Sequence, residues 1–104
     1  MSNARDIADV GWTIKAFCLA ASPSDTSPVG YNISSFEDTG SGHFTINFEN
    51  NLNTTSYVML GTAYNRIIGG GTRAVNQITA VQPLDNAGNF ADFPDGSFLF
   101  LERS

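Results

Sequence analysis

The feature that most constrains the fold is a pair of short apolar segments, residues 31–36 and 43–48, joined by a turn that contains two glycines. In the second segment Phe44, Ile46 and Phe48 occupy alternate positions, with polar residues between them. Successive side chains of a β-strand point to opposite faces, so this alternation places three large apolar groups on one face. Glycines supply the positive φ angles that a tight connection between antiparallel strands needs. The region therefore predicts a β-hairpin.

The rest of the chain shows the same pattern of strands and turns. Short apolar and β-branched runs are bounded by Gly, Pro, Asn, Asp and Ser, and we expect further strands at residues 12–20, 56–63, 73–81 and 98–101. The irregular spacing of Val75, Ile78 and Val81 indicates a bulge in the third of these. Several short strands with loops between them predict an all-β fold, an antiparallel β-sandwich. We expect residues 12–104 to form this single domain and residues 1–11 to be an N-terminal extension.

Composition and charge argue against several classes of partner. The net charge is −5 and the five Lys and Arg residues are scattered, which opposes binding to nucleic acid or to an anionic membrane surface. No apolar stretch approaches the roughly 18 residues that a membrane span requires, so we expect no membrane insertion. Charged residues make up only 14% of the chain, against about 25% in typical domains. Part of the surface is therefore expected to be covered by something else.

Some of the predicted strands are apolar on both faces, as in the run Phe98-Leu99-Phe100-Leu101. A two-layer sandwich covers only the inner face of each sheet, and an outer face that meets water is normally polar. A long loop of the same chain or a neighbouring subunit could cover the outer faces, and the low charge favours the subunit. We therefore predict a homo-oligomer whose interface contains Phe17, Leu19, Met59, Leu99 and Leu101.

Motifs for catalysis and metal binding are sparse. The chain has one histidine, His43, and one cysteine, Cys18, so neither an internal disulfide nor a C-x-x-C site can form. Cys18 lies in an apolar run and is expected to be buried. No nucleophile-elbow motif accompanies the serines, and the adjacent carboxylates Glu37 and Asp38 are typical of a turn. We expect no enzymatic activity, no cofactor and no metal. The alternative left open is a Ca²⁺ site in one acidic loop.

That loop, residues 85–95, is the strongest candidate for binding a ligand. Its Asp and Asn side chains offer oxygen ligands for Ca²⁺, but their spacing does not fit an EF-hand and solvated turns are favoured. Its two aromatic rings could instead form a platform for a sugar, or they could pack beneath the loop. The turn at residues 64–66 adds exposed candidates. The predicted binding residues are Phe90, Phe93, Asp85, Asn89, Asp92, Tyr64 and Arg66.

The hairpin also resembles a segment of a known family. Residues 31–48 read YNISSFEDTGSGHFTINF, and they are similar to a segment common in tail-fibre tip domains of tailed bacteriophages, approximately Y-N-V-S-S-I-x-D-x-G-x-G-x-Y-T-V-N-F. Residues 14–17 resemble the V-K-A-W strand that precedes it there, and residues 56–63 resemble the N-Y-x-V-x-G-x-A strand that follows. The resemblance covers residues 12–64. Phe17 stands at the tryptophan position of that pattern.

The resemblance implies a trimeric β-sandwich at the distal end of a fibre, whose loops bind a glycan or protein receptor on the host-cell surface. It also implies localisation in the virion, on the phage tail or particle surface, after synthesis in the host cytoplasm. Other virion proteins are then further partners. The alternative is a purely structural decoration or connector protein of a phage particle that binds no receptor. Low charge and many loops suit both classes, and the sequence leaves both open.

Overall fold

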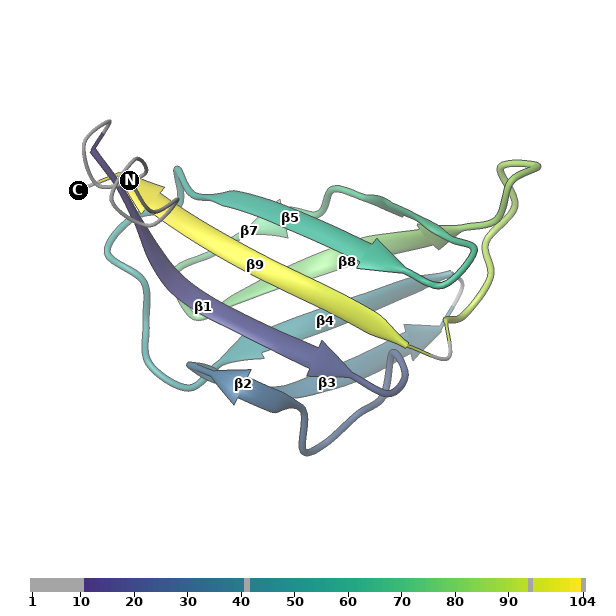
Figure 1. Cartoon of the computed structure of the whole chain (residues 1–104), viewed down its shortest axis with the longest axis horizontal. Coiled ribbons are helices and arrows are strands. Elements are labelled where there is room, and N and C mark those ends of the chain that lie inside the picture. The colour runs from purple at the N-terminus through teal and green to yellow at the C-terminus, as the bar shows by residue number, and fades with distance from the viewer. Residues whose placement is uncertain (1–10, 41, 94, 104) are drawn as a thin grey trace, which may run out of the picture.

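The computed structural model describes residues 11–40, 42–93 and 95–103, and this part of the chain is all-β, without a helix (Figure 1). No described segment, accordingly, forms a helix of the length and hydrophobicity that crossing a membrane requires. The predicted extension at residues 1–11 lies, except for its last residue, outside the described residues. The strands are β1 (Trp12–Ala20), β2 (Val29–Tyr31), β3 (Ile33–Gly40), β4 (His43–Phe48), β5 (Val58–Ala63), β6 (Ile67–Gly69), β7 (Thr72–Arg73), β8 (Gln77–Leu84) and β9 (Gly96–Arg103).

The first of two antiparallel sheets has the strand order β2-β1-β9-β5. β1 coincides with the strand predicted at residues 12–20, and β9 extends the one predicted at residues 98–101 in both directions. These two central strands pair along their length, with Trp12 opposite Arg103 and Ala20 opposite Gly96. The beginning of β1 and the end of β9 therefore lie together at one end of the molecule (Figure 1).

The predicted hairpin is confirmed by β3 and β4, which pair antiparallel in the second sheet. This sheet has the order β3-β4-β8-β6, and the short β7 also pairs with β8. Phe44, Ile46 and Phe48 are buried in the core, as their alternation predicts. Thr45, which lies between two of them, is buried as well. Gly42 in the turn has a φ of 75°, in the left-handed region that favours glycine.

The strand predicted at residues 73–81 is divided into β7 and β8 in the structure. Ile78 and Val81 are both fully buried although they are three positions apart, and Ala80 between them has a φ of 57°. The pairing of β8 with β4 shifts register over the same stretch. An extra residue in the strand returns Val81 to the inner face, so the predicted bulge is confirmed.

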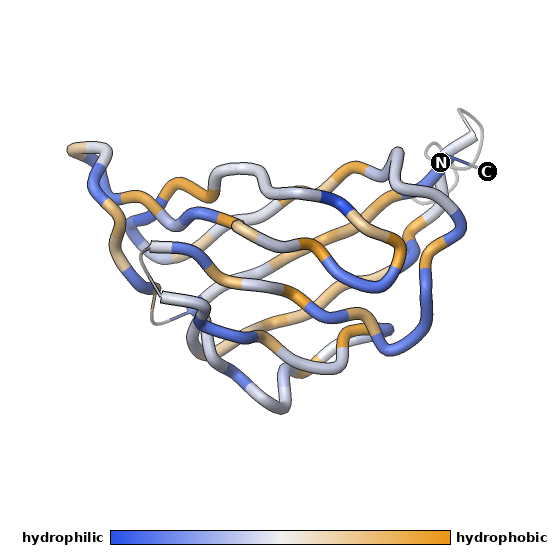
Figure 2. The backbone as a smooth tube through the Cα atoms, turned by 180° about the vertical axis from the view of Figure 1, so that it is seen from behind, coloured by the Kyte–Doolittle hydropathy of each residue, from blue (hydrophilic) through white to orange (hydrophobic). Residues whose placement is uncertain are grey.

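The core lies between the two sheets and is rich in aromatic rings. Phe36 and Phe44 of the second sheet contact Phe98 of the first, with ring centroids 5.3 and 5.9 Å apart. Such pairs add to the gain from burying non-polar surface. Figure 2 shows hydrophobic residues along the strands of both sheets. With the inner faces buried against each other, the outer faces and the loops remain for contacts with other molecules.

Candidate functional site

Several loops gather at the end of the molecule opposite the start of β1, and we call this region the loop end (Figure 1). It comprises residues 64–66, residues 85–93 and the β3–β4 turn. Asp85 shapes the longest of these loops, because its Oδ1 accepts hydrogen bonds from the backbone N–H groups of Ala87 and Asn89 at 2.9 and 3.0 Å. Asp85 is thus a turn-forming residue. No group of three or more His, Cys, Asp or Glu residues that could hold a metal occurs in the described part of the chain.

The two aromatic residues of the long loop have different environments. Phe93 is 2% exposed and packs against Phe44 and Phe98, with ring centroids 5.3 and 5.8 Å apart. Phe90 is 53% exposed, and its ring centroid lies 5.5 Å from the centroid of the His43 ring. The expectation of a two-ring platform is therefore corrected, because Phe93 belongs to the core and only Phe90 is accessible to a ligand.

The β3–β4 turn supplies the surface on which Phe90 rests. A Cβ atom at Gly42 would overlap the ring of Phe90, so the ring can lie here only beside a glycine. His43, the next residue, places its Nε2 3.1 Å from the side-chain nitrogen of Gln82, which holds the imidazole beneath Phe90. Because the turn and the loop are far apart in the sequence, no local pattern identifies this contact.

Arg66 links the two loops of the loop end. Its Nε donates to two successive backbone carbonyl oxygens, those of Ala91 at 3.3 Å and Asp92 at 2.9 Å. Arg66 is therefore a positioning residue for the loop. Tyr64, two residues earlier, is 68% exposed, and Asn89 is exposed as well. Of the predicted binding residues, the structure leaves the side chains of Tyr64, Asn89, Phe90 and Asp92 accessible.

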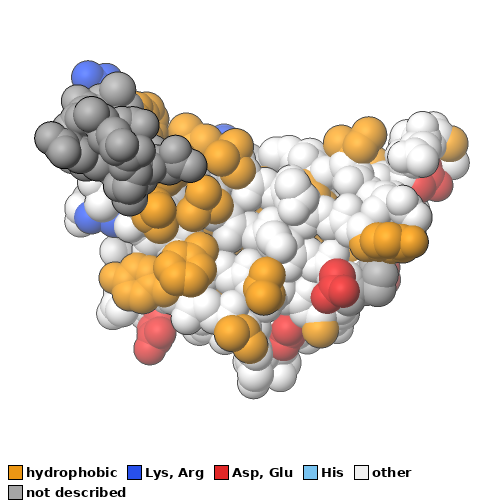
Figure 3. All heavy atoms as spheres, viewed as in Figure 1, with side chains coloured by type: hydrophobic (Ala, Val, Ile, Leu, Met, Phe, Trp, Pro, Cys, Tyr) orange, Lys and Arg blue, Asp and Glu red, His pale blue; other side chains and the backbone are white. Residues whose placement is uncertain are grey.

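The outer face of the first sheet carries a cluster of exposed hydrophobic side chains (Figure 3). We call this cluster the apolar face, and its members are Ile14, Phe17, Leu19, Val29, Tyr31 and Leu60. Phe17 and Tyr31 pair across β1 and β2, and their rings stack with centroids 5.9 Å apart. No loop within the described ranges covers these side chains. Exposed hydrophobic clusters of this kind mark interaction sites in soluble proteins.

The predicted interface residues divide between the two faces of this sheet. Phe17 and Leu19 belong to the apolar face. Leu99 and Leu101 lie beside it and are half-buried. Met59, in contrast, packs against the core. Because side chains alternate along β5, the outer contact of this strand comes from the neighbouring Leu60 rather than from Met59.

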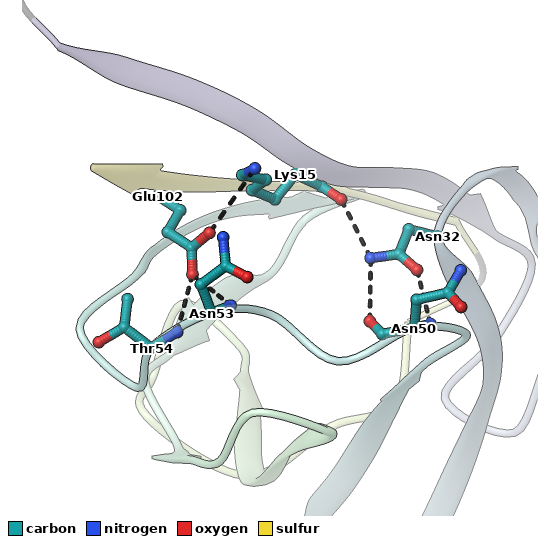
Figure 4. A network of polar contacts seen from close by, with 6 residues as sticks. All are labelled: Lys15, Asn32, Asn50, Asn53, Thr54 and Glu102. Atoms are coloured by element: carbon teal, nitrogen blue, oxygen red, sulfur yellow. Dashed lines mark hydrogen bonds and ion pairs between the residues drawn. The ribbon is translucent and has the colours of Figure 1, made fainter. Parts of the chain in front are cut away.

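A polar network lies at the end opposite the loop end, between β1, β9 and the loop that follows β4 (Figure 4). Glu102 is 1% exposed, and its Oε2 accepts hydrogen bonds from the backbone N–H groups of Asn53 and Thr54 at 2.7 and 2.9 Å. Its Oε1 has no hydrogen-bond partner and lies 3.9 Å from the Nζ of Lys15. Sequence reasoning missed this network, because Glu102 follows an apolar run and its partners are distant in the sequence.

Cys18 is 3% exposed, so its predicted burial is confirmed. Burial, with a smaller contribution from the negative charge of Asp25, raises the pKa of the Cys18 thiol to about 12. The side chain therefore stays protonated near neutral pH, and a thiol is a poor nucleophile.

Comparison with protein-family models, with curated proteins and with solved structures finds no match for this chain.

Proposed function

We propose that this protein is a homotrimeric β-sandwich of a phage particle, a tail-fibre tip or knob that binds a host-surface receptor through its loop end. The observation that carries the proposal is the apolar face, where six large hydrophobic side chains are exposed on one sheet. Removing such surface from water is favourable by roughly 25 cal/mol for each Å². In the assembly, the apolar face of each copy would be covered by a neighbouring copy.

The shape of the outer face favours a head-to-tail contact between copies. On the β1–β2 side, Phe17 and Tyr31 project as a stacked pair. At the end of the sheet nearest the loop end the surface is hollowed, and a depression of about 420 Å³ is lined by Leu19 of β1, Thr62 and Ala63 of β5, Tyr64 and residues 95–97. A projection at one place on this face and a depression at another suit a head-to-tail contact, and such contacts form a closed ring when the rotation between successive copies closes.

The loop end supplies the receptor contact in this proposal. Phe90 is an exposed aromatic side chain, and Arg66 holds the backbone of its loop. An aromatic ring beside polar groups can bind both the non-polar face and the hydroxyl groups of a sugar. The first and last strands begin and end at the opposite end of the molecule (Figure 1). In a ring whose axis runs along the strands, all loop ends would point the same way, away from an attachment near the chain ends.

Assignment to a phage particle is supported by the resemblance of residues 31–48 to segments of fibre-tip domains. These residues include the β3–β4 hairpin, whose turn also seats Phe90. The segment that resembles fibre-tip domains thus contributes its turn to the loop end. A purely structural virion protein would use this surface to hold another virion protein instead of a receptor.

Two measurements test the proposal. Light scattering of the purified protein at micromolar concentration should give three times the chain mass of 11.1 kDa, and a particle of single-chain mass would overturn the self-association. Binding to whole bacterial cells, tested across a panel of strains, should occur for the trimer and be lost in Phe90→Ala. A trimer that binds no strain, while an antibody locates it within phage particles by electron microscopy, would establish the structural alternative.

A further inference from the structure

A pocket of about 160 Å³ is lined by the buried side chain of Glu102, and Figure 4 shows the polar contacts around this side chain. We propose that this pocket binds a neutral saccharide unit, whose hydroxyl groups bond to Glu102, to Lys15 and to the side-chain amides of the loop after β4. The pocket is large enough for one sugar ring. Its lining is mostly polar and includes Lys15, Asn32, Asn50, Asn51, Asn53 and Glu102.

The unpartnered oxygen of Glu102 is the first argument for a ligand. Buried polar atoms in proteins almost always have a hydrogen-bond partner, because leaving one without a partner is costly. The Oε1 of Glu102 has none, and the 3.9 Å to the Nζ of Lys15 exceeds the length of a hydrogen bond. One hydroxyl group placed between these atoms could donate to Oε1 and accept from Nζ. The Lys15 side chain is one-third exposed and can move aside to admit it.

The charges of the pocket select the class of ligand. A free anion would meet the carboxylate of Glu102, and a free cation would meet the ammonium group of Lys15. A neutral molecule with adjacent hydroxyl groups meets neither repulsion, since each hydroxyl both donates and accepts. The asparagine side chains at the rim likewise offer both donors and acceptors. A carboxylate, an ammonium group and several amides in one pocket therefore favour binding of a neutral sugar over binding of an ion.

The pocket is held in shape before any ligand binds. The side-chain nitrogen of Asn32 donates to the carbonyl oxygens of Lys15 and Asn50 at 3.1 and 3.2 Å, and its Oδ1 accepts from the N–H of Asn50 at 2.7 Å (Figure 4). Leu52 is buried, and its N–H donates to the carbonyl oxygen of Val75 at 2.8 Å. A loop anchored at these points loses little freedom on binding, which favours affinity.

The inference does not rest on the proposed function. A chain that remains a single copy, or that attaches to no cell, could still bind a sugar here. The experiment is therefore made on the purified, ¹⁵N-labelled protein by nuclear magnetic resonance. D-glucose, D-galactose and N-acetyl-D-glucosamine are the probes, added separately to millimolar concentration, and glycine is added in a parallel series.

We expect at least one of the sugars to cause saturable shifts of the backbone N–H signals of Asn53 and Thr54 and of the side-chain amide signal of Asn51. Glu102→Gln should weaken this binding at least about tenfold, because a neutral amide accepts a hydrogen bond less strongly than a carboxylate. The glutamine keeps an acceptor for the two backbone N–H groups. If that variant does not fold, Asn51→Ala, at an exposed position, should still weaken binding severalfold.

The control variant is Asn86→Ala, an exposed asparagine of the loop end, which should leave sugar binding unchanged. Three outcomes would overturn the inference. The first is the absence of shifts with all three sugars, which would leave water as the occupant. The second is shifts confined to the loop end. The third is saturable binding of glycine without binding of any sugar, which would indicate a site for a zwitterion.

Discussion

The two faces of the first sheet are similar in composition and opposite in environment. On β1, Cys18 points inward and is 3% exposed, whereas its neighbour Phe17 points outward and is 47% exposed. On β9, Phe100 is fully buried, and Leu99 on the other face is half-buried. The second sheet covers the inner face, and nothing in the described part of the chain covers the outer one. Non-polar side chains on a sheet therefore indicate that the face is buried against another surface, but they do not indicate which surface that is.

The largest effect should come from emptying the inner face. Phe100→Ala removes a fully buried ring and should lower the free energy of unfolding by about 3–5 kcal/mol, measured by urea denaturation. Phe17→Ala, on the outer face, should change the unfolding of a single copy by less than about 1 kcal/mol. If Phe100→Ala does not fold, Phe100→Leu gives a smaller loss that can be measured. Equal effects at the two positions would contradict the contrast between the faces.

A charge on the outer face should change the mass of the particle rather than the stability of one copy. Phe17→Asp places a carboxylate in the apolar face, and burying it in an interface without a partner is unfavourable. Light scattering should show the mass of a single chain for this variant. Thr55→Asp, at an exposed loop position, adds the same charge and should leave the assembly intact. A trimer that persists in Phe17→Asp would show that this face is not the interface.

Thiol labelling can compare the two faces of β1 directly. Cys18 should react slowly with a thiol reagent at any pH well below 12, because burial keeps it protonated and inaccessible. A cysteine at position 19, made by Leu19→Cys with Cys18→Ala, should react rapidly when the protein is dilute and slowly when it self-associates. Rapid labelling at every concentration would mean that the outer face stays open.

The raised pKa of Cys18 also makes stability depend on pH in the alkaline range. In the unfolded chain the thiol has a pKa of about 8.5, and in the folded protein the pKa is about 12. Between these values the unfolded chain loses a proton that the folded chain keeps, so stability falls as the pH rises through this range. Cys18→Ala should remove this contribution, which thermal unfolding at several alkaline pH values would measure.

The most local effect concerns the loop end, where one ring contact is at stake. Gly42→Ala and Gly40→Ala both place a side chain at a positive φ, which costs about 1–2 kcal/mol each. Only at Gly42 would the added methyl group overlap Phe90. Gly42→Ala should therefore abolish the nuclear Overhauser contact between the rings of Phe90 and His43, and Gly40→Ala should keep it. Loss of the contact in both variants would mean that the turn as a whole, and not the absence of a side chain at Gly42, seats the ring.

Local patterns predicted the elements that depend on alternation and turn chemistry. The hairpin, the strand at residues 12–20 and the bulge near Ala80 all follow from the spacing of apolar residues and glycines along the chain. Patterns failed where a residue's role depends on a distant partner. Phe90 and Phe93 look alike in sequence, yet Phe93 meets the core between the sheets and Phe90 meets the β3–β4 turn.

The sequence by itself determined that this chain is all-β and that one sheet has more non-polar surface than a single partner sheet can cover. Both conclusions depend on the two-residue period of a strand, which is a local property. Only the tertiary structure decided that Met59 points inward, that Leu60 points outward, and that Glu102 lies buried beside Lys15. These facts depend on register and on contacts between segments far apart in the chain, and no short-range pattern encodes them.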